Sequence, residues 1–185
     1  AAFPGWRALA WERRVRIVRE AAEKIAERNL ELAAWMVYEV GKTRLEAMAE
    51  VEESADLLRY YAERLESHRG YRRPLARMSP DEATESVLLP YGVWAVVSPF
   101  NFPSALAAGM IAGALLGGNT VVFKPAIDAP VSGELLCEAL WASGVPRDAL
   151  QLVHGPGSSV GAALLADPRI AGVAFTGSSA VGMQI

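Results

Sequence analysis

Cysteine and histidine are scarce in this sequence, with one cysteine and two histidines among 185 residues. The lone Cys137 excludes an internal disulfide framework and is typical of a protein kept in a reducing compartment. The zinc-binding patterns H-E-x-x-H and C-x-x-C do not occur in the sequence, so no motif predicts a metal site. We therefore expect a cytoplasmic protein without a metal centre.

Long apolar runs and an excess of positive charge are also missing. Lys and Arg number 18 against 21 Asp and Glu, and the formal net charge is -3. Many of these charges alternate along residues 1–73, which is typical of solvated helix faces and not of a nucleic-acid-binding surface. No apolar run reaches the roughly 18 to 20 residues needed to cross a membrane. The sequence therefore predicts neither nucleic acid nor a membrane as a partner.

The first 68 residues have the apolar spacing of amphipathic helices. Intervals of three and four residues predict helices near 11–25, 29–40 and 43–67, and Gly41 is a natural end for the second. The buried stripe predicted for the third helix consists of Leu45, Met48, Val51, Ala55, Leu58, Ala62 and Leu65. This stripe stops after three heptads, which favours one long helix lying on a core over a coiled coil.

Beyond a polar, proline-containing connection, apolar strands alternate with helices. The predicted strands are 92–98, 120–124, 150–154 and 170–175, and the predicted helices are 103–117, 130–143, 158–166 and one that starts near 178. This alternation indicates right-handed βαβ units in an α/β fold with a doubly wound, mostly parallel, Rossmann-like sheet that is buried on both faces. We therefore expect a helical lead-in at 1–68, a linker or hairpin at 69–90 and an incomplete nucleotide-binding domain at 91–185.

In such sheets ligands bind beyond the carboxyl ends of the strands, so the residues that follow each strand are the candidates for a site. After the first strand, "SPFNFP" brackets Asn101 between two prolines and two phenylalanines, which predicts an asparagine held rigidly by fixed backbone angles and packed rings. After the second strand, Lys124 is the only lysine beyond residue 42. It can donate to ribose hydroxyls or a phosphate, or it can be a solvated lysine that ends a strand.

Glycines and serines follow the last two strands. "HGPGSSVG" approaches a dinucleotide fingerprint but has the wrong spacing, so a plain glycine turn with Ser158 as the helix cap remains an alternative. In "FTGSSAVG", Gly177 permits a close backbone approach. Ser178 begins a helix whose free N–H groups can bind a pyrophosphate, and it can also serve as a simple cap. Asp128 is expected to cap the helix that starts at residue 130.

Three motifs in order, "PFNFP", "GNTVVFKPA" and "FTGSSAVG", resemble those of the NAD(P)-dependent aldehyde dehydrogenase superfamily. The resemblance covers essentially the whole chain, from the helical lead-in to most of the cofactor domain. The segment "EESADLLRYYAE", the Gly109–Met110 pair and the run "GVPRDALQLVHGPGSSVGAALLADPRIAGVAFTG" look most like the branch of 1-pyrroline-5-carboxylate dehydrogenases. That branch oxidises glutamate semialdehyde in proline catabolism.

The resemblance implies that the amide of Asn101 helps to form an oxyanion hole. In the family a cysteine thiolate attacks the aldehyde carbonyl, the resulting oxyanion expels hydride to the nicotinamide, and a thioester is hydrolysed. Donors that are fixed in advance need no reorganisation, which accounts for a rigid "SPFNFP". The cofactor-binding residues implied for NAD or NADP are Ser98, Pro99, Phe100, Asn101, Lys124, Gly157, Gly177 and Ser178. Lys124 would hold the adenosine ribose and Ser178 the pyrophosphate.

The sequence departs from the family pattern at two positions. Phe100 stands where the family usually has tryptophan, an exchange expected to keep the packing. Ile127 stands where many members have a glutamate that accepts hydrogen bonds from the ribose, so we expect a relaxed preference between NAD and NADP. The family's catalytic cysteine and general-base glutamate correspond to positions past residue 185. Cys137 does not match that cysteine and is predicted to be a buried structural thiol in mid-helix. We therefore expect a piece of a longer protein that is inactive by itself.

Two other functions remain open at this stage. One is a non-catalytic nucleotide-binding or scaffold module of the same fold, and the other is an aldehyde dehydrogenase that forms an acyl-CoA or phosphorylated product. In the family, strands corresponding to residues 69–90 take part in assembly, so a homo-oligomer acting on a small aldehyde is expected.

Overall fold

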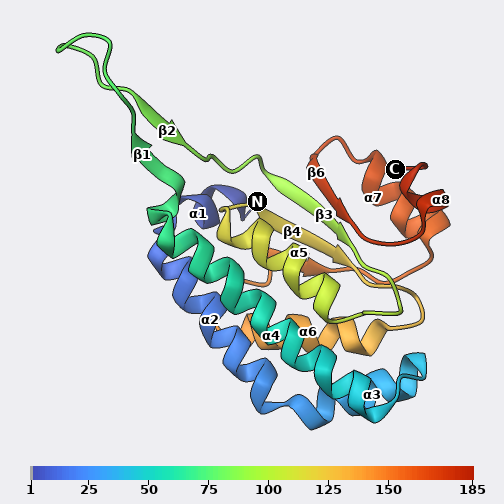
Figure 1. Ribbon diagram of the computed structural model, residues 1–185. Coiled ribbons are helices and arrows are strands. Elements are labelled where there is room, and N and C mark those ends of the chain that lie inside the picture. The colour runs from blue at the N-terminus through green and yellow to red at the C-terminus, as the bar shows by residue number, and fades with distance from the viewer. Residues whose placement is uncertain (1) are drawn as a thin grey trace.

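The computed structural model describes residues 2–185, which begin with a series of helices (Figure 1). These are α1 (Phe3–Ala8), α2 (Trp11–Glu27), α3 (Asn29–Val40) and α4 (Arg44–Ser67). A 3₁₀ turn (Arg69–Tyr71) leads into the hairpin of β1 (Arg72–Pro74) and β2 (Glu85–Val87). The rest is β3 (Val93–Val97), α5 (Ala105–Leu116), β4 (Thr120–Lys124), α6 (Pro130–Ala142), β5 (Leu150–Leu152), α7 (Ala162–Ala166), β6 (Ile170–Phe175) and α8 (Ser179–Gly182).

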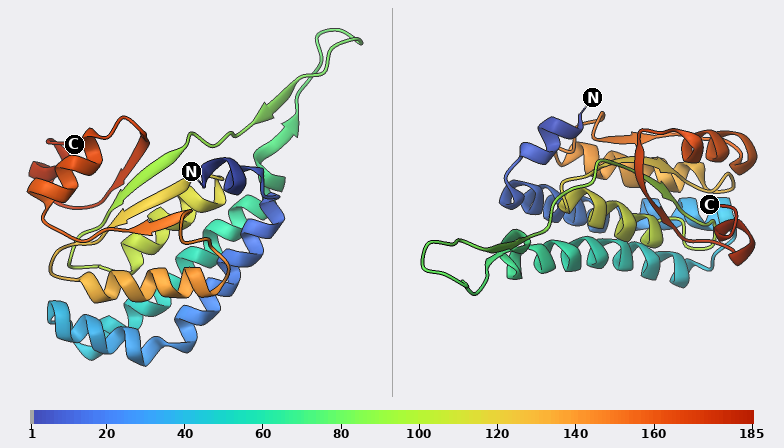
Figure 2. Two further views of the ribbon diagram at one scale, coloured as in Figure 1. Left: turned by 180° about the vertical axis from the view of Figure 1, so that it is seen from behind. Right: turned by 90° about the horizontal axis from the view of Figure 1, so that it is seen from above.

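The larger sheet is parallel throughout and has the strand order β5-β4-β3-β6. Helices α5 and α6 connect successive strands in one direction, whereas α7 returns across the sheet to β6. Because such crossovers are right-handed, α5 and α6 cover one face and α7 lies on the other (Figures 1 and 2). The predicted doubly wound α/β fold is confirmed.

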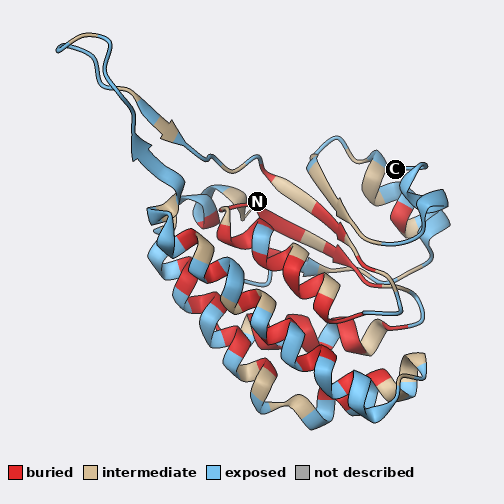
Figure 3. Ribbon diagram, viewed as in Figure 1, coloured by how far each residue is buried: buried red, intermediate tan, exposed pale blue. Residues whose placement is uncertain are grey.

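The helical lead-in packs against the face of the sheet that α5 and α6 cover. Helices α2 and α4 lie side by side, and their buried faces join those of α5 and α6 in one hydrophobic cluster (Figure 3). The predicted helices near 11–25, 29–40 and 43–67 are confirmed, and Gly41 closes α3 with a φ of 70°. The division into domains at 1–68, 69–90 and 91–185 stays a prediction. Within residues 2–185 no helix is both long and apolar enough to cross a membrane.

The buried stripe predicted for α4 is wrong at its N-terminal end. Leu45 and Met48 are 79% and 40% exposed, whereas Ala47 and Glu50 are buried in their place. This end of α4 faces the N-terminus of α5, where the backbone N–H groups of Ser104 and Ala105 require an acceptor. A polar side chain therefore takes the inner position, and the larger apolar side chains turn outward.

The last units of the sheet are less regular than the sequence predicts. The strand predicted at 150–154 ends at Leu152, and residues 157–161 form a π-helical turn before α7. No side chain caps this turn, so the predicted capping role of Ser158 is wrong. Strand β6, predicted to be buried on both faces, is half-buried along most of its length. Within residues 2–185 it pairs with β3 alone, and a strand at an edge has fewer neighbours to cover it.

The connection at 69–90 is a hairpin that projects from the body of the protein (Figure 1). Its strands are antiparallel, with Arg72 opposite Val87 and Pro74 opposite Glu85, and nearly all of its residues are exposed. A hairpin at this position was one of the two forms that the sequence predicted. Its role in assembly stays a prediction.

Candidate functional site

The carboxyl ends of the parallel strands meet at one edge of the sheet. Val97, the last residue of β3, is in register with Lys124 of β4 and with Phe175 of β6. The pairing continues past the strands, since Ser98 N donates to Lys124 O at 3.4 Å and Thr176 N donates to Val97 O at 3.1 Å. The structure therefore brings the loops that begin at 98, 124 and 176 side by side.

The loop between β3 and α5 presents Asn101 outward. Asn101 is exposed, so its amide is accessible to a ligand, as an oxyanion donor requires. The expected packing of the two phenylalanines is incomplete, because Phe100 and Phe102 are 54% and 40% exposed. The ends of the loop are buried more completely, since Ser98 and Ser104 are 4% and 1% exposed. The oxyanion role of Asn101 stays a prediction.

Lys124 is buried at the centre of this edge. It is 5% exposed, so the alternative of a solvated lysine is wrong. Its Nζ donates to the carbonyl oxygen of Pro125 at 2.7 Å, and an ammonium has two further N–H groups to offer. Burial lowers the pKa of Lys124, because water no longer stabilises the charge. A ligand that supplies oxygen acceptors would offset this cost.

The glycine turn after β5 lies against Lys124. A Cβ atom on buried Gly161 would stand 3.7 Å from Lys124 Cε, so the turn packs closely over the lysine stem. Gly157 is exposed, with open space where a Cβ atom would stand, and its place beside a ligand stays a prediction. Residues 157–161 also match the hydrolase pattern G-x-S-x-G. In hydrolases that serine sits on a sharp strand-to-helix elbow, whereas here it lies in a π-helical turn.

Carboxylates already occupy two of the helix N-termini at this edge. Glu50 accepts from Ser104 N at 2.8 Å at the start of α5. Glu39 of α3 accepts from Val131 N at 2.7 Å and Ser132 N at 2.8 Å at the start of α6. The predicted capping role of Asp128 is therefore wrong. A negatively charged phosphate is disfavoured at both helices, because the acceptor position is filled by a like charge.

The start of α8 is a helix N-terminus at this edge that no carboxylate occupies. Only a neutral side chain caps it, the Ser178 hydroxyl, which accepts from Val181 N at 3.3 Å. The predicted cap is confirmed, and the pyrophosphate role of Ser178 stays a prediction. Gly177 beside it cannot carry a side chain without a shift, because a Cβ atom there would stand 2.5 Å from the Phe175 ring.

Cys137 does not belong to this edge. It lies on the buried face of α6 and is 0% exposed. Burial raises the pKa of its thiol, with a smaller contribution from the charge of Glu134, so the thiolate needed for nucleophilic attack is disfavoured. The predicted structural thiol is confirmed. No cluster of metal-ligating side chains occurs within residues 2–185.

Comparison with known proteins assigns the chain to a family. The family model described as the aldehyde dehydrogenase family matches residues 1–185. The chain belongs to the aldehyde dehydrogenase family. It is 38% identical over 185 residues to 1-pyrroline-5-carboxylate dehydrogenase 1 of Halalkalibacterium halodurans, covering 100% of this chain and 35% of that protein. This aldehyde dehydrogenase chain thus spans about a third of the length of the curated relatives it matches.

Solved structures of the family superpose closely on this aldehyde dehydrogenase chain. Proline utilization A from Bdellovibrio bacteriovorus is 34% identical with a TM-score of 0.93, over 99% of this chain and 19% of that one. An NADP-dependent enzyme of E. coli is 34% identical with a TM-score of 0.92, over 99% and 38%. The predicted membership of the superfamily and the predicted similarity to its 1-pyrroline-5-carboxylate dehydrogenase branch are confirmed.

Sequence reasoning missed the acidic residues that accept hydrogen bonds from the first N–H groups of α5 and α6 in this aldehyde dehydrogenase chain. Glu50 and Glu39 were not predicted as functional or structural residues. One signal was present, because Glu50 lies three residues after Ala47 and one before Val51 on the inner face of α4. An acidic residue within an apolar face indicates a buried partner.

Proposed function

We propose that this chain supplies the helical lead-in and most of the cofactor-binding domain of an enzyme that oxidises an aldehyde to a carboxylate with NAD(P)+. Its family uses NAD(P)+ and oxidises aldehydes. The observation that carries the proposal is the position of exposed Asn101 at the same sheet edge as buried Lys124. The two residues proposed to bind the oxyanion and the ribose thereby follow or end neighbouring strands.

In this proposal each strand-end loop has a separate task. The bound cofactor supplies the acceptor for the electrons removed from the aldehyde. The amide of Asn101 donates to the carbonyl oxygen as it becomes negative. Lys124 donates to the ribose hydroxyls of the adenosine, and the first N–H groups of α8 with Ser178 hold the pyrophosphate. Ser98 and Pro99 border the nicotinamide through their backbone, since the Ser98 side chain is 4% exposed.

We further propose L-glutamate 5-semialdehyde as the substrate. The relatives that match the chain at 36% to 38% identity are named 1-pyrroline-5-carboxylate dehydrogenases, and proline utilization A is among the similar structures. We also infer a cytoplasmic homo-oligomer. Apolar side chains exposed beside the hairpin, Leu88, Leu89 and Tyr91, support association with a second copy, because they are 59%, 64% and 78% exposed.

The activity is tested by aldehyde-dependent reduction of NAD+ with the purified full-length protein. We expect turnover of glutamate semialdehyde without added coenzyme A or phosphate, and no turnover by residues 1–185 alone, because their one cysteine is buried. Turnover that requires coenzyme A would assign an acylating enzyme. Binding of NAD+ without turnover of any aldehyde would assign a nucleotide-binding module and contradict the proposal.

The cofactor preference is expected to depend on Ile127, which is 59% exposed in the loop after β4. An isoleucine cannot accept hydrogen bonds from the ribose, and it does not repel a 2′-phosphate. We expect kcat/KM for NAD+ and NADP+ to agree within about tenfold, because the charged hydrogen bond that would favour NAD+ by ~1.5–3 kcal/mol is absent. Ile127→Glu should shift the ratio toward NAD+ by about tenfold or more.

Ile127→Leu is the matched control, because it keeps an apolar side chain of the same size. Steady-state kinetics with both cofactors measures the effect. A strong preference of the unchanged protein for NAD+ would contradict the prediction, as would a ratio that Ile127→Glu leaves unaltered.

A further inference from the structure

A carboxylate is buried on α4 directly beneath the loop that carries Asn101. Glu50 is 1% exposed, although the helix around it has a solvated outer face. An ionised carboxylate is costly to bury unless it is paired and hydrogen-bonded. The partners of Glu50 therefore indicate why an acidic residue stands where an apolar one would pack.

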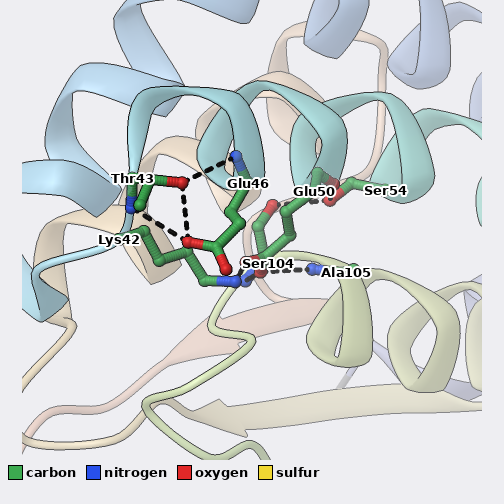
Figure 4. A network of polar contacts seen from close by, with 7 residues as sticks. All are labelled: Lys42, Thr43, Glu46, Glu50, Ser54, Ser104 and Ala105. Atoms are coloured by element: carbon green, nitrogen blue, oxygen red, sulfur yellow. Dashed lines mark hydrogen bonds and ion pairs between the residues drawn. The ribbon is translucent and has the colours of Figure 1, made fainter.

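The carboxylate of Glu50 holds the first turn of α5. Its Oε1 accepts from Ser104 N at 2.8 Å and from Ala105 N at 3.2 Å. These are N–H groups that a helix start leaves without an internal partner, and a negative charge there also compensates the helix dipole. The hydroxyl oxygen of Ser54, one turn further along α4, lies 2.8 Å from the hydroxyl oxygen of Ser104. The start of α5 is thus attached to α4 at adjacent points (Figure 4).

A lysine completes the arrangement and extends it into the loop. Lys42 Nζ lies 2.7 Å from Glu50 Oε2, an ion pair in which both side chains are largely buried. The same Nζ stands 3.8 Å from the centre of the Phe102 ring, within the range of a cation–π contact. Phe102 directly follows Asn101 in the chain. The pair therefore contacts the loop immediately after Asn101 and again two residues further on.

We propose that Glu50 and Lys42 are positioning residues that fix the amide of Asn101 in the orientation that stabilises the oxyanion. This inference rests on the proposed function. Between the end of β3 and the start of α5 the loop belongs to no helix or strand, so its contacts with Lys42 and Glu50 determine where Asn101 points. Misplacing a catalytic group by about 1 Å can cost about a hundredfold in rate. Neither residue touches the substrate, and both act through residues 102–105.

The full-length enzyme offers a matched pair of variants for the test. Glu50→Ala removes the acceptor at the start of α5, and Glu39→Ala removes the equivalent acceptor at the start of α6. We expect Glu50→Ala to lower kcat by about 10- to 100-fold at saturating cofactor, with the KM for NAD+ changed less than about threefold. Glu39→Ala should leave kcat at saturating cofactor within about twofold.

Conservative variants separate positioning from folding. Glu50→Gln keeps an oxygen that accepts from Ser104 N and Ala105 N, so we expect it to recover most of kcat. If Glu50→Ala does not fold, the comparison of Glu50→Gln with the double variant described next tests the proposal in its place. In Glu50→Gln the ion pair is lost, and a further loss of kcat in the double variant Glu50→Gln/Lys42→Met would report the contact of Lys42 with Phe102. An equal kcat for Glu50→Gln and the double variant would overturn the role of Lys42.

Hydrogen exchange measured by mass spectrometry tests the anchoring independently of catalysis. Peptides covering residues 98–106 of the full-length protein should exchange faster in Glu50→Ala than in the unchanged protein, and not in Glu39→Ala. Unchanged exchange in Glu50→Ala overturns the inference, and so does faster exchange with an unchanged kcat. An unchanged protein that oxidises no aldehyde would instead overturn the proposed function, whatever the exchange shows.

Discussion

Replacing Asn101 with alanine in the full-length enzyme is expected to lower kcat by about 10²–10³-fold. The side chain is exposed at the carboxyl edge, so its loss removes a donor without opening a cavity in the core. A donor that acts on the developing oxyanion stabilises the transition state more than the bound aldehyde. The KM for NAD+ should therefore change little. Steady-state rates of NADH formation, with thermal unfolding as the check on folding, measure the effect.

A neighbouring exposed residue provides the control for Asn101→Ala. Asp128 lies at the same edge and is exposed, and it does not cap α6, so Asp128→Ala should keep kcat within about twofold. A kcat for Asn101→Ala within about threefold of the unchanged enzyme would contradict the oxyanion role. An equal loss of kcat in both variants would show a general effect on the sheet edge.

The fold was predictable because its signals are local and repeated. Runs such as "VWAVV" and "TVVFK" combine β-branched residues with flanking glycine or proline, and the structure places β3 and β4 on them. The helices α2 and α3 follow from three- and four-residue spacing and from the glycine at their boundary with α4. Where local residues decide the element, the sequence was sufficient.

The helix starts were not predictable from local residues. Ser158 and Asp128 stand in the positions that usually cap a helix, yet neither does so. The start of α6 is held by Glu39, which precedes Val131 by 92 positions in the chain. Since a cap needs only an oxygen at the right place, packing can supply it from any element, and a linear sequence does not show which element is near.

The candidate site, too, was predictable where local residues decide it and not where tertiary packing does. The strand-end rule selected Asn101, Lys124 and Ser178 because parallel strands bring their carboxyl ends together, and the register of β3 with β4 and β6 does so. Their chemical roles came from resemblance and stay predictions. The burial of Lys124 and the contacts of Glu50 depend on tertiary packing, and only the structure revealed them.

Replacing Lys124 with methionine is expected to weaken the binding of NAD+ by about 10- to 100-fold, which corresponds to the loss of ~1.5–3 kcal/mol from hydrogen bonds made by a charged donor. Methionine fills the space of the lysine stem that packs against Gly161, so the turn at 157–161 should keep its place. Isothermal titration of NAD+ into the full-length protein measures the change. Lys24→Met is the control, because Lys24 lies on α2 within a solvent-exposed ion pair.

Lys124→Met, which is expected to weaken the binding of NAD+, should make the protein without cofactor more stable. Burial lowers the pKa of Lys124 in the folded protein, so between this lowered pKa and the ordinary pKa of the unfolded chain the unfolded state binds more protons. The free energy of unfolding therefore rises as the pH increases through that window. Lys124→Met removes this rise and should be the more stable protein below the window. If the proposed contact with the ribose is correct, the charge that destabilises the protein without cofactor is the charge that binds NAD+. Binding of NAD+ that is unchanged in Lys124→Met would show that the charge serves some other purpose.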